Sequence, residues 1–159
     1  MKKIVILFFI LMLILFLYIS LGYVFNINRI LIPDFWLVLV FFLALYYNHS
    51  EAFGLVFILG LFRDIFEIGM FGMNSFLFLI IVFFIKYILS RIYKDNLFNI
   101  LLILFLSSIG YYFLKFVVYN IGGYEVKFGY IYILKSLIVV VVSPIIFQIF
   151  HKIIKQEKE

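Results

Sequence analysis

The sequence predicts an all-α integral membrane protein, folded as one compact bundle of six transmembrane helices. Of its 159 residues, 68% are hydrophobic and only 13% are charged, whereas a soluble domain is about 45 to 50% apolar and ~25% charged. The apolar residues form six runs separated by short polar segments. A helix needs about 20 residues to cross a bilayer core about 30 Å thick, so little chain remains outside the membrane. We therefore expect a single membrane domain over residues 1–159.

The first two predicted helices are apolar over most of their length. Helix one is expected at residues 4–25, directly after Lys2 and Lys3. Its apolar run is longer than the ~7 to 15 residues of a signal peptide, so we expect it to be retained. Helix two is expected at residues 30–47 and begins near Pro33, because a proline in the first helical turn removes a backbone N–H that has no partner there.

The third and fourth predicted helices are short. Helix three, at residues 52–68, spans a membrane only if Arg63, Asp64 and Glu67 lie near its far end. Helix four is expected at residues 73–89. Each of these segments contains 17 residues, which leaves open a re-entrant hairpin that enters the membrane from the cytoplasm.

The last two predicted helices complete the bundle. Helix five is expected at residues 97–119 and helix six at residues 130–150. Pro144 lies inside helix six, where it removes a backbone hydrogen bond and predicts a kink.

The basic residues predict the orientation of the bundle. Cytoplasmic ends of membrane helices carry an excess of lysine and arginine. With six helices, one side of the membrane receives a large basic set, namely Lys2, Lys3, Lys86, Arg91, Lys94, Lys152, Lys155 and Lys158. The other side receives only Arg29 and Lys127. Both termini are therefore predicted to be cytoplasmic, in the inner membrane of a bacterium if the resemblance described below holds.

Several charged residues fall inside predicted helices and need partners. A charge at the bilayer centre costs about 2.5 to 3.5 kcal/mol on insertion scales. Lys115 and Lys135 lie at a depth similar to that of Asp64 and Glu67, so we expect the two acids to pair with these lysines across helices. The alternative for the lysines is that their long side chains reach the outer headgroups. Gly60 lies one helical turn before Asp64 and would allow a neighbouring backbone to approach.

The sequence also argues against several function classes. It contains no cysteine, which excludes disulfides and thiolate metal sites. His49 and His151 have no third metal ligand at usable spacing, and no catalytic set or phosphate-binding loop is found. The net charge of +5 has no soluble domain in which to form a nucleic-acid surface. We expect a protein that is no enzyme and binds no metal, cofactor or nucleic acid, in contact with membrane lipid.

Two motifs resemble a known family. The first opens helix two with Pro33, Asp34 and Trp36. The second is rich in glycine, with one acid, and consists of Gly54, Gly60, Asp64, Gly69 and Gly72. Together with the size of the chain and its two basic termini, this pattern resembles the MreD family of the bacterial rod-shape system. The candidate structural or partner-contact residues are Pro33, Asp34, Gly54, Gly60, Arg63, Asp64, Glu67, Gly69, Gly72, Lys115 and Lys135.

The resemblance implies a non-enzymatic component of the elongasome that supports lateral peptidoglycan synthesis and cell shape. It implies MreC as the main partner, with MreB, a SEDS glycosyltransferase and a class B penicillin-binding protein in the same assembly. The alternative is a substrate-binding S component of an energy-coupling-factor vitamin transporter, which has a similar number of helices. Those components typically carry Ala-x3-Ala in the first helix, whereas this chain contains only Ala44 and Ala52.

Overall fold

The computed structural model describes residues 34–66, 70–91, 97–124 and 129–156. All regular elements in these ranges are helices, which agrees with the predicted all-α class. They are α2 (Phe35–Tyr46), α3 (His49–Phe66), α4 (Met73–Leu89), α5 (Leu97–Ile121) and α6 (Tyr130–Gln156). The predicted helix at residues 4–25 lies outside the described residues.

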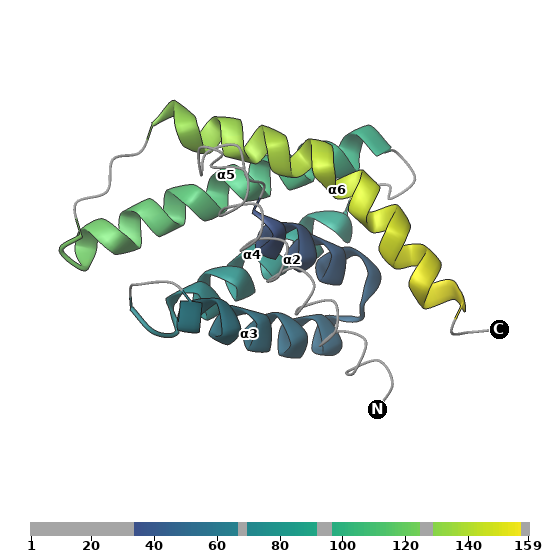
Figure 1. Cartoon of the computed structure of the whole chain (residues 1–159), viewed down its shortest axis with the longest axis horizontal. Coiled ribbons are helices and arrows are strands. Elements are labelled where there is room, and N and C mark those ends of the chain that lie inside the picture. The colour runs from purple at the N-terminus through teal and green to yellow at the C-terminus, as the bar shows by residue number, and fades with distance from the viewer. Residues whose placement is uncertain (1–33, 67–69, 92–96, 125–128, 157–159) are drawn as a thin grey trace, which may run out of the picture.

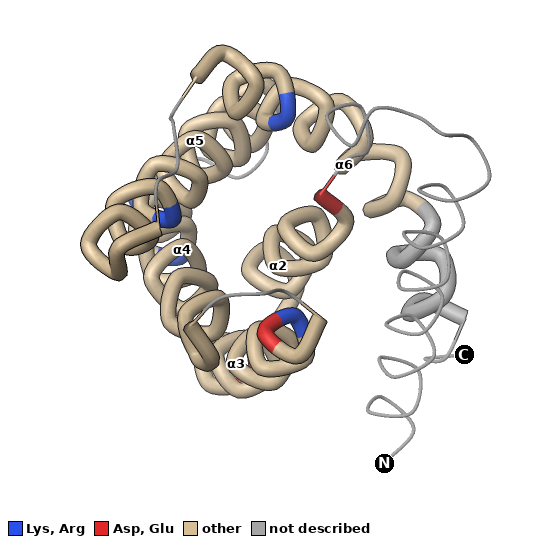
Figure 2. The backbone as a smooth tube through the Cα atoms, turned by 60° about the vertical axis from the view of Figure 1, so that its left-hand side comes forward, with Lys and Arg blue, Asp and Glu red and all other residues tan. Residues whose placement is uncertain are grey.

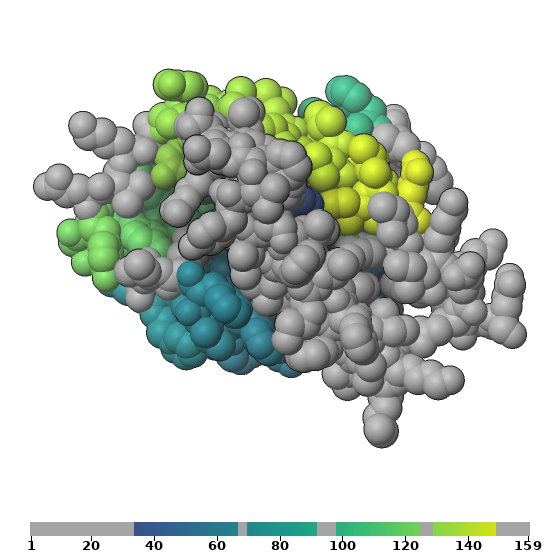
Figure 3. Space-filling view, in the orientation of Figure 1, coloured from purple at the N-terminus to yellow at the C-terminus, as the bar shows by residue number. Residues whose placement is uncertain are grey.

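Successive helices run in opposite directions, so the α3–α4 turn and the α5–α6 connection lie at the same end of the molecule (Figure 1). Viewed along the bundle, α2 lies inside an arc formed by α3, α4, α5 and α6 (Figure 2). The surface view shows α3 in teal and α5 and α6 in green to yellow on the face in view (Figure 3). The arrangement therefore has one inner helix and four outer ones among the residues described.

The inner position of α2 explains its sequence. Every residue from Trp36 to Ala44 is buried, and all of them are apolar. A helix that is hydrophobic on every side is buried on every side, and α2 packs against α3, α4 and α6. With 12 residues and a rise of about 1.5 Å per residue, α2 is only ~18 Å long.

Several helix ends differ from the predicted ones. α3 begins at His49, so the turn expected before Ala52 is instead the first turn of the helix. The Ala52 N–H donates to the Asn48 carbonyl at 2.9 Å, and Glu51 lies in the first turn, where the helix dipole favours an acid. α5 continues two residues past the predicted end, to Ile121, and α6 six residues past it, to Gln156.

Two helices are clearly long and apolar enough to cross a membrane. They are the segments Phe98–Ile121 of α5 and Tyr130–Gln148 of α6. α6 contains Pro144 without a break in the helix, and it changes direction along its length (Figure 1). α2 and α4 are shorter apolar helices. Two membrane-length helices support the membrane class, and six complete crossings stay a prediction.

Candidate functional site

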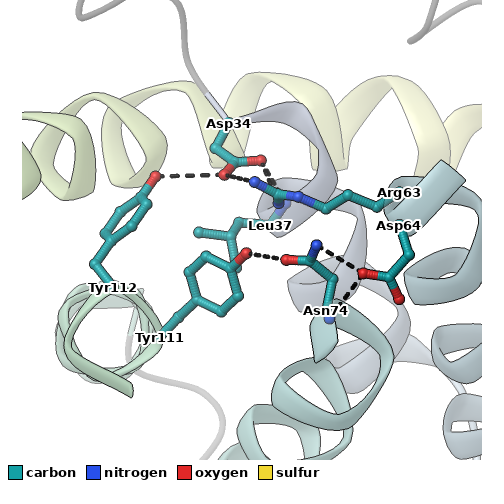
Figure 4. Close-up of polar contacts among 7 residues, drawn as sticks. All are labelled: Asp34, Leu37, Arg63, Asp64, Asn74, Tyr111 and Tyr112. Atoms are coloured by element: carbon teal, nitrogen blue, oxygen red, sulfur yellow. Dashed lines mark hydrogen bonds and ion pairs between the residues drawn. The ribbon is translucent and has the colours of Figure 1, made fainter. Parts of the chain in front are cut away.

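Polar side chains from four helices meet at one end of the bundle (Figure 4). This end is the one at which α2 and α4 begin and α3 finishes. We call the group the polar network, and its members are Asp34, Arg63, Asp64, Asn74, Ser75, Tyr111 and Tyr112. Its members are buried or half-buried, so each needs a partner within the protein.

Asp34 joins the start of α2 to α3. Its carboxylate accepts two hydrogen bonds from the Arg63 guanidinium, with Nη1–Oδ1 and Nη2–Oδ2 distances of 3.0 and 2.9 Å. The same carboxylate caps α2 by accepting from the Leu37 N–H at 3.4 Å. The two side chains are only 11% and 12% exposed. This paired, two-point geometry is the strongest form of an arginine–carboxylate contact.

Aromatic rings surround the Arg63 guanidinium. Its central carbon lies 5.4 Å from the ring centroids of both Phe78 and Tyr111, within the range of a cation–π interaction. The Tyr112 hydroxyl lies 3.5 Å from Asp34 Oδ2, at the outer limit of a hydrogen bond. The arginine charge is therefore stabilised by one carboxylate and by two ring faces from α4 and α5.

Asp64 caps the start of α4 from the neighbouring helix. Its oxygens accept from the backbone N–H groups of Gly72 and Asn74, both at 3.0 Å. They also accept from Asn74 Nδ2 at 2.9 Å and from Ser75 Oγ at 3.2 Å. Gly72, the N-cap residue of α4, has φ +89° and offers no side chain of its own as a cap. An acid from α3 thus supplies what the first turn of α4 lacks, at the positive end of that helix.

Asn74 continues the network to α5. Its Oδ1 accepts from the Tyr111 hydroxyl at 2.7 Å, while its Nδ2 donates to Asp64. Tyr111 is fully buried, and its ring lies 5.5 Å from that of Phe78. The asparagine amide therefore uses both of its ends to hold α3, α4 and α5 together.

Gly60 allows α3 and α4 to approach closely enough for this cap. A Cβ atom at Gly60 would lie 2.3 Å from the Cα atom and 2.6 Å from the backbone nitrogen of Ser75. These are backbone atoms, so no side-chain movement could make room. The predicted role of Gly60 as a close packing position is thus located inside the bundle, between α3 and α4. At Gly54, in contrast, an added Cβ would meet nothing within 4 Å.

The expected pairing of Asp64 with Lys115 or Lys135 is wrong. The partners of Asp64 are the amide and hydroxyl donors at the start of α4. Lys115 Nζ instead lies over the rings of Tyr111 and Tyr119, 5.9 and 5.5 Å from their centroids. Depth along the helices suggested lysine partners, but the nearest donors to a carboxylate at the end of α3 belong to the adjoining helix start.

Other network residues were not foreseen from the sequence. Asn74 and Ser75 could have been noticed, because polar residues at a helix start are common capping groups. Tyr111 and Tyr112 carry no such signal in a chain with 12 tyrosines. Of the predicted site residues, Pro33, Glu67 and Gly69 lie outside the described residues.

The Asp34–Arg63 pair leads to a prediction about stability. Arg63→Met alone leaves a buried carboxylate without its counter-charge, which costs about 3 to 5 kcal/mol. The double variant Asp34→Asn/Arg63→Met removes both charges, and asparagine still caps a helix well. We expect the double variant to recover most of the stability lost in Arg63→Met, as measured by the midpoint of denaturation of purified protein in detergent. A double variant no more stable than Arg63→Met would contradict this account.

The chemistry available to the network is that of structural hydrogen bonds. Within the described ranges, no three His, Cys, Asp or Glu residues are placed to hold a metal ion. In the same ranges, the buried side-chain polar atom that has no hydrogen-bond partner is Ser107 Oγ, which lies one turn before Tyr111 on α5. The carboxylates already accept hydrogen bonds from neighbouring helices, so the network joins helices.

Comparison with protein families identifies this chain. The family model described as rod shape-determining protein MreD matches residues 1–154. No curated protein and no solved structure gives a match. Because the family model covers nearly the whole chain, the chain belongs to the MreD family.

Proposed function

We propose that this member of the MreD family acts as a scaffold in the bacterial cytoplasmic membrane, where it supports lateral peptidoglycan synthesis through helix contacts with MreC. The family is rod shape-determining and non-enzymatic, and its members are membrane proteins. The polar network supports the scaffold role, because its charged groups are engaged with each other or with helix ends. Such a protein acts through its shape and its outer surface.

The outer surface supports the same proposal. On α5, Phe98, Leu102, Leu106 and Phe113 are between 46% and 69% exposed and recur at the spacing of one helical face. On α6, Leu137, Val141 and Ile145 form a similar exposed face. Apolar faces of this kind suit either acyl chains or the transmembrane helix of a partner. MreC is the partner we propose for such a face. MreB, the SEDS glycosyltransferase and the class B penicillin-binding protein belong to the assembly by resemblance.

The proposed orientation has both termini in the cytoplasm. Arg91 follows α4, and it belongs to the cytoplasmic basic set defined above. With this orientation, the polar network lies in the outer half of the membrane, and the α5–α6 connection faces the periplasm. The positive-inside rule supports this assignment.

Depletion of the protein in its own cells tests the function. We expect rod-shaped cells to widen and become round within a few generations, and a plasmid copy of the wild-type gene to restore the rods. Cells that keep their shape but lose uptake of a vitamin would contradict the proposal and favour the transporter alternative.

A further inference from the structure

The turn between α3 and α4 exposes large apolar side chains where a membrane hairpin usually has polar ones. Ile65, Phe66, Met70 and Phe71 are 64%, 60%, 44% and 72% exposed. We call these four residues the α3–α4 tip. The first turn of α4 adds Phe76, which is 61% exposed. Water is a poor environment for such a group, so some apolar phase or surface should cover it.

The helices that lead to the tip are short. α3 has 18 residues and α4 has 17, which correspond to about 27 and ~26 Å. A bilayer hydrocarbon core is about 30 Å thick. α5 has 25 residues, or about 38 Å, and ends at the same end of the molecule (Figure 1). α5 can therefore reach the surface of the membrane on a path along which α3 and α4 stop roughly 10 Å earlier.

The backbone of the tip has partners for its donors within the protein. Irregular backbone inside a membrane is tolerated where its hydrogen-bonding groups are satisfied by protein. Asp64 accepts the N–H groups of Gly72 and Asn74 at 3.0 Å, and the Met73 N–H donates to the Met70 carbonyl at 3.2 Å. The start of α4 thus needs no water, although helix starts normally expose unpaired donors.

The charges near the tip are also compensated inside the bundle. Arg63 is held by the Asp34 carboxylate, and Asp64 is held by the start of α4. The remaining acid in the sequence of the turn is Glu67, which favours a depth at which a carboxylate can still reach lipid headgroups.

We propose that the α3–α4 tip is a lipid-binding surface, which ends among the acyl chains of one leaflet at their boundary with the headgroups. Its ligand is the upper part of the lipid acyl chains. Lipid is favoured over a protein partner because the satisfied backbone, the compensated charges and the short helices all adapt the turn to an apolar solvent. The α3–α4 hairpin then enters the membrane without crossing it completely.

Cysteine labelling tests this proposal, because the chain has no cysteine of its own. Phe71→Cys is the test position, and Phe76→Cys repeats the test at a second exposed side chain. Tyr124→Cys, in the connection that follows α5, is the control. The purified full-length variants are placed in lipid nanodiscs and treated with a charged maleimide, and each labelling rate is divided by that of the same variant denatured in SDS.

We expect the charged maleimide to label native Phe71→Cys at least ten times more slowly than its denatured form, and Tyr124→Cys at a rate close to that of its denatured form. A bimane group at Phe71→Cys should be quenched by lipids that carry a nitroxide high on the acyl chain. Fast labelling of Phe71→Cys in nanodiscs would overturn the proposal and place the tip in water. Protection in cells that disappears in nanodiscs would overturn it in favour of a protein partner.

Discussion

Asp64→Leu is expected to prevent the chain from accumulating as a folded protein, whereas Asp64→Asn should retain part of its function. Leucine leaves the backbone N–H groups of Gly72 and Asn74 without acceptors in the interior, and each buried unpaired donor costs about 1 to 3 kcal/mol. The amide and hydroxyl of Asn74 and Ser75 lose the same partner. Asparagine keeps one oxygen acceptor and loses the favourable charge at the helix start, worth about 0.3 to 2 kcal/mol.

The amount of each Asp64 variant in the membrane, and its elution as a monodisperse peak in detergent, measure this effect. Glu51→Leu is the matched control, because Glu51 is an exposed acid on the same helix and should accumulate normally. A normal level and normal cell shape with Asp64→Leu would show that the cap is dispensable. A normal level and normal partner binding with an inactive Asp64→Asn would instead indicate a chemical role for the carboxylate.

Gly60→Leu is expected to separate α3 from α4, and Gly60→Ala to do so to a smaller extent. Even one added carbon would lie 2.3 Å from the Ser75 Cα atom, so the helices must move apart. Overpacking of this kind costs about 1 to 3 kcal/mol for a small group, and leucine adds three further carbons. The movement also withdraws Asp64 from the start of α4, since Asp64 lies one turn after Gly60 on the same helix.

The same substitutions at Gly54 provide the control for Gly60. An added Cβ at Gly54 meets nothing within 4 Å, and alanine is about 1 kcal/mol better than glycine inside a helix. We expect Gly54→Ala and Gly54→Leu to denature at or above the wild-type midpoint in detergent. Equal loss at both glycines would mean that helix propensity, rather than the contact with Ser75, determines the effect at Gly60.

Local patterns in the sequence were sufficient to predict the helical fold. Apolar runs of membrane length lie in α5 and α6, and Gly60 was recognised as a packing position because small residues allow helices to approach. The N-terminal end of α2 was also foreseen, since Pro33 and Asp34 suit a helix start. These features depend on residues close together in the chain.

The partners within the candidate site could not be predicted in the same way. Asp34 and Arg63 are 29 residues apart, and Tyr111 is 37 residues from Asn74. Their contacts depend on α2 lying inside the arc of the other helices, which hydropathy does not indicate. Estimates of depth placed Asp64 beside Lys115 and Lys135, but depth alone cannot distinguish a lysine on another helix from the N–H groups at the start of the next one.

The recovery of MreC with the tagged chain, per mole of folded chain, tests the scaffold proposal most directly. It should be measured for the wild type and for Asp34→Asn/Arg63→Met, which removes both charges of the ion pair. If the polar network only builds the fold and the outer surface holds the partner, both proteins should recover MreC in the same ratio. A wild-type chain that recovers no MreC, or a well-folded double variant that loses it, would contradict the account.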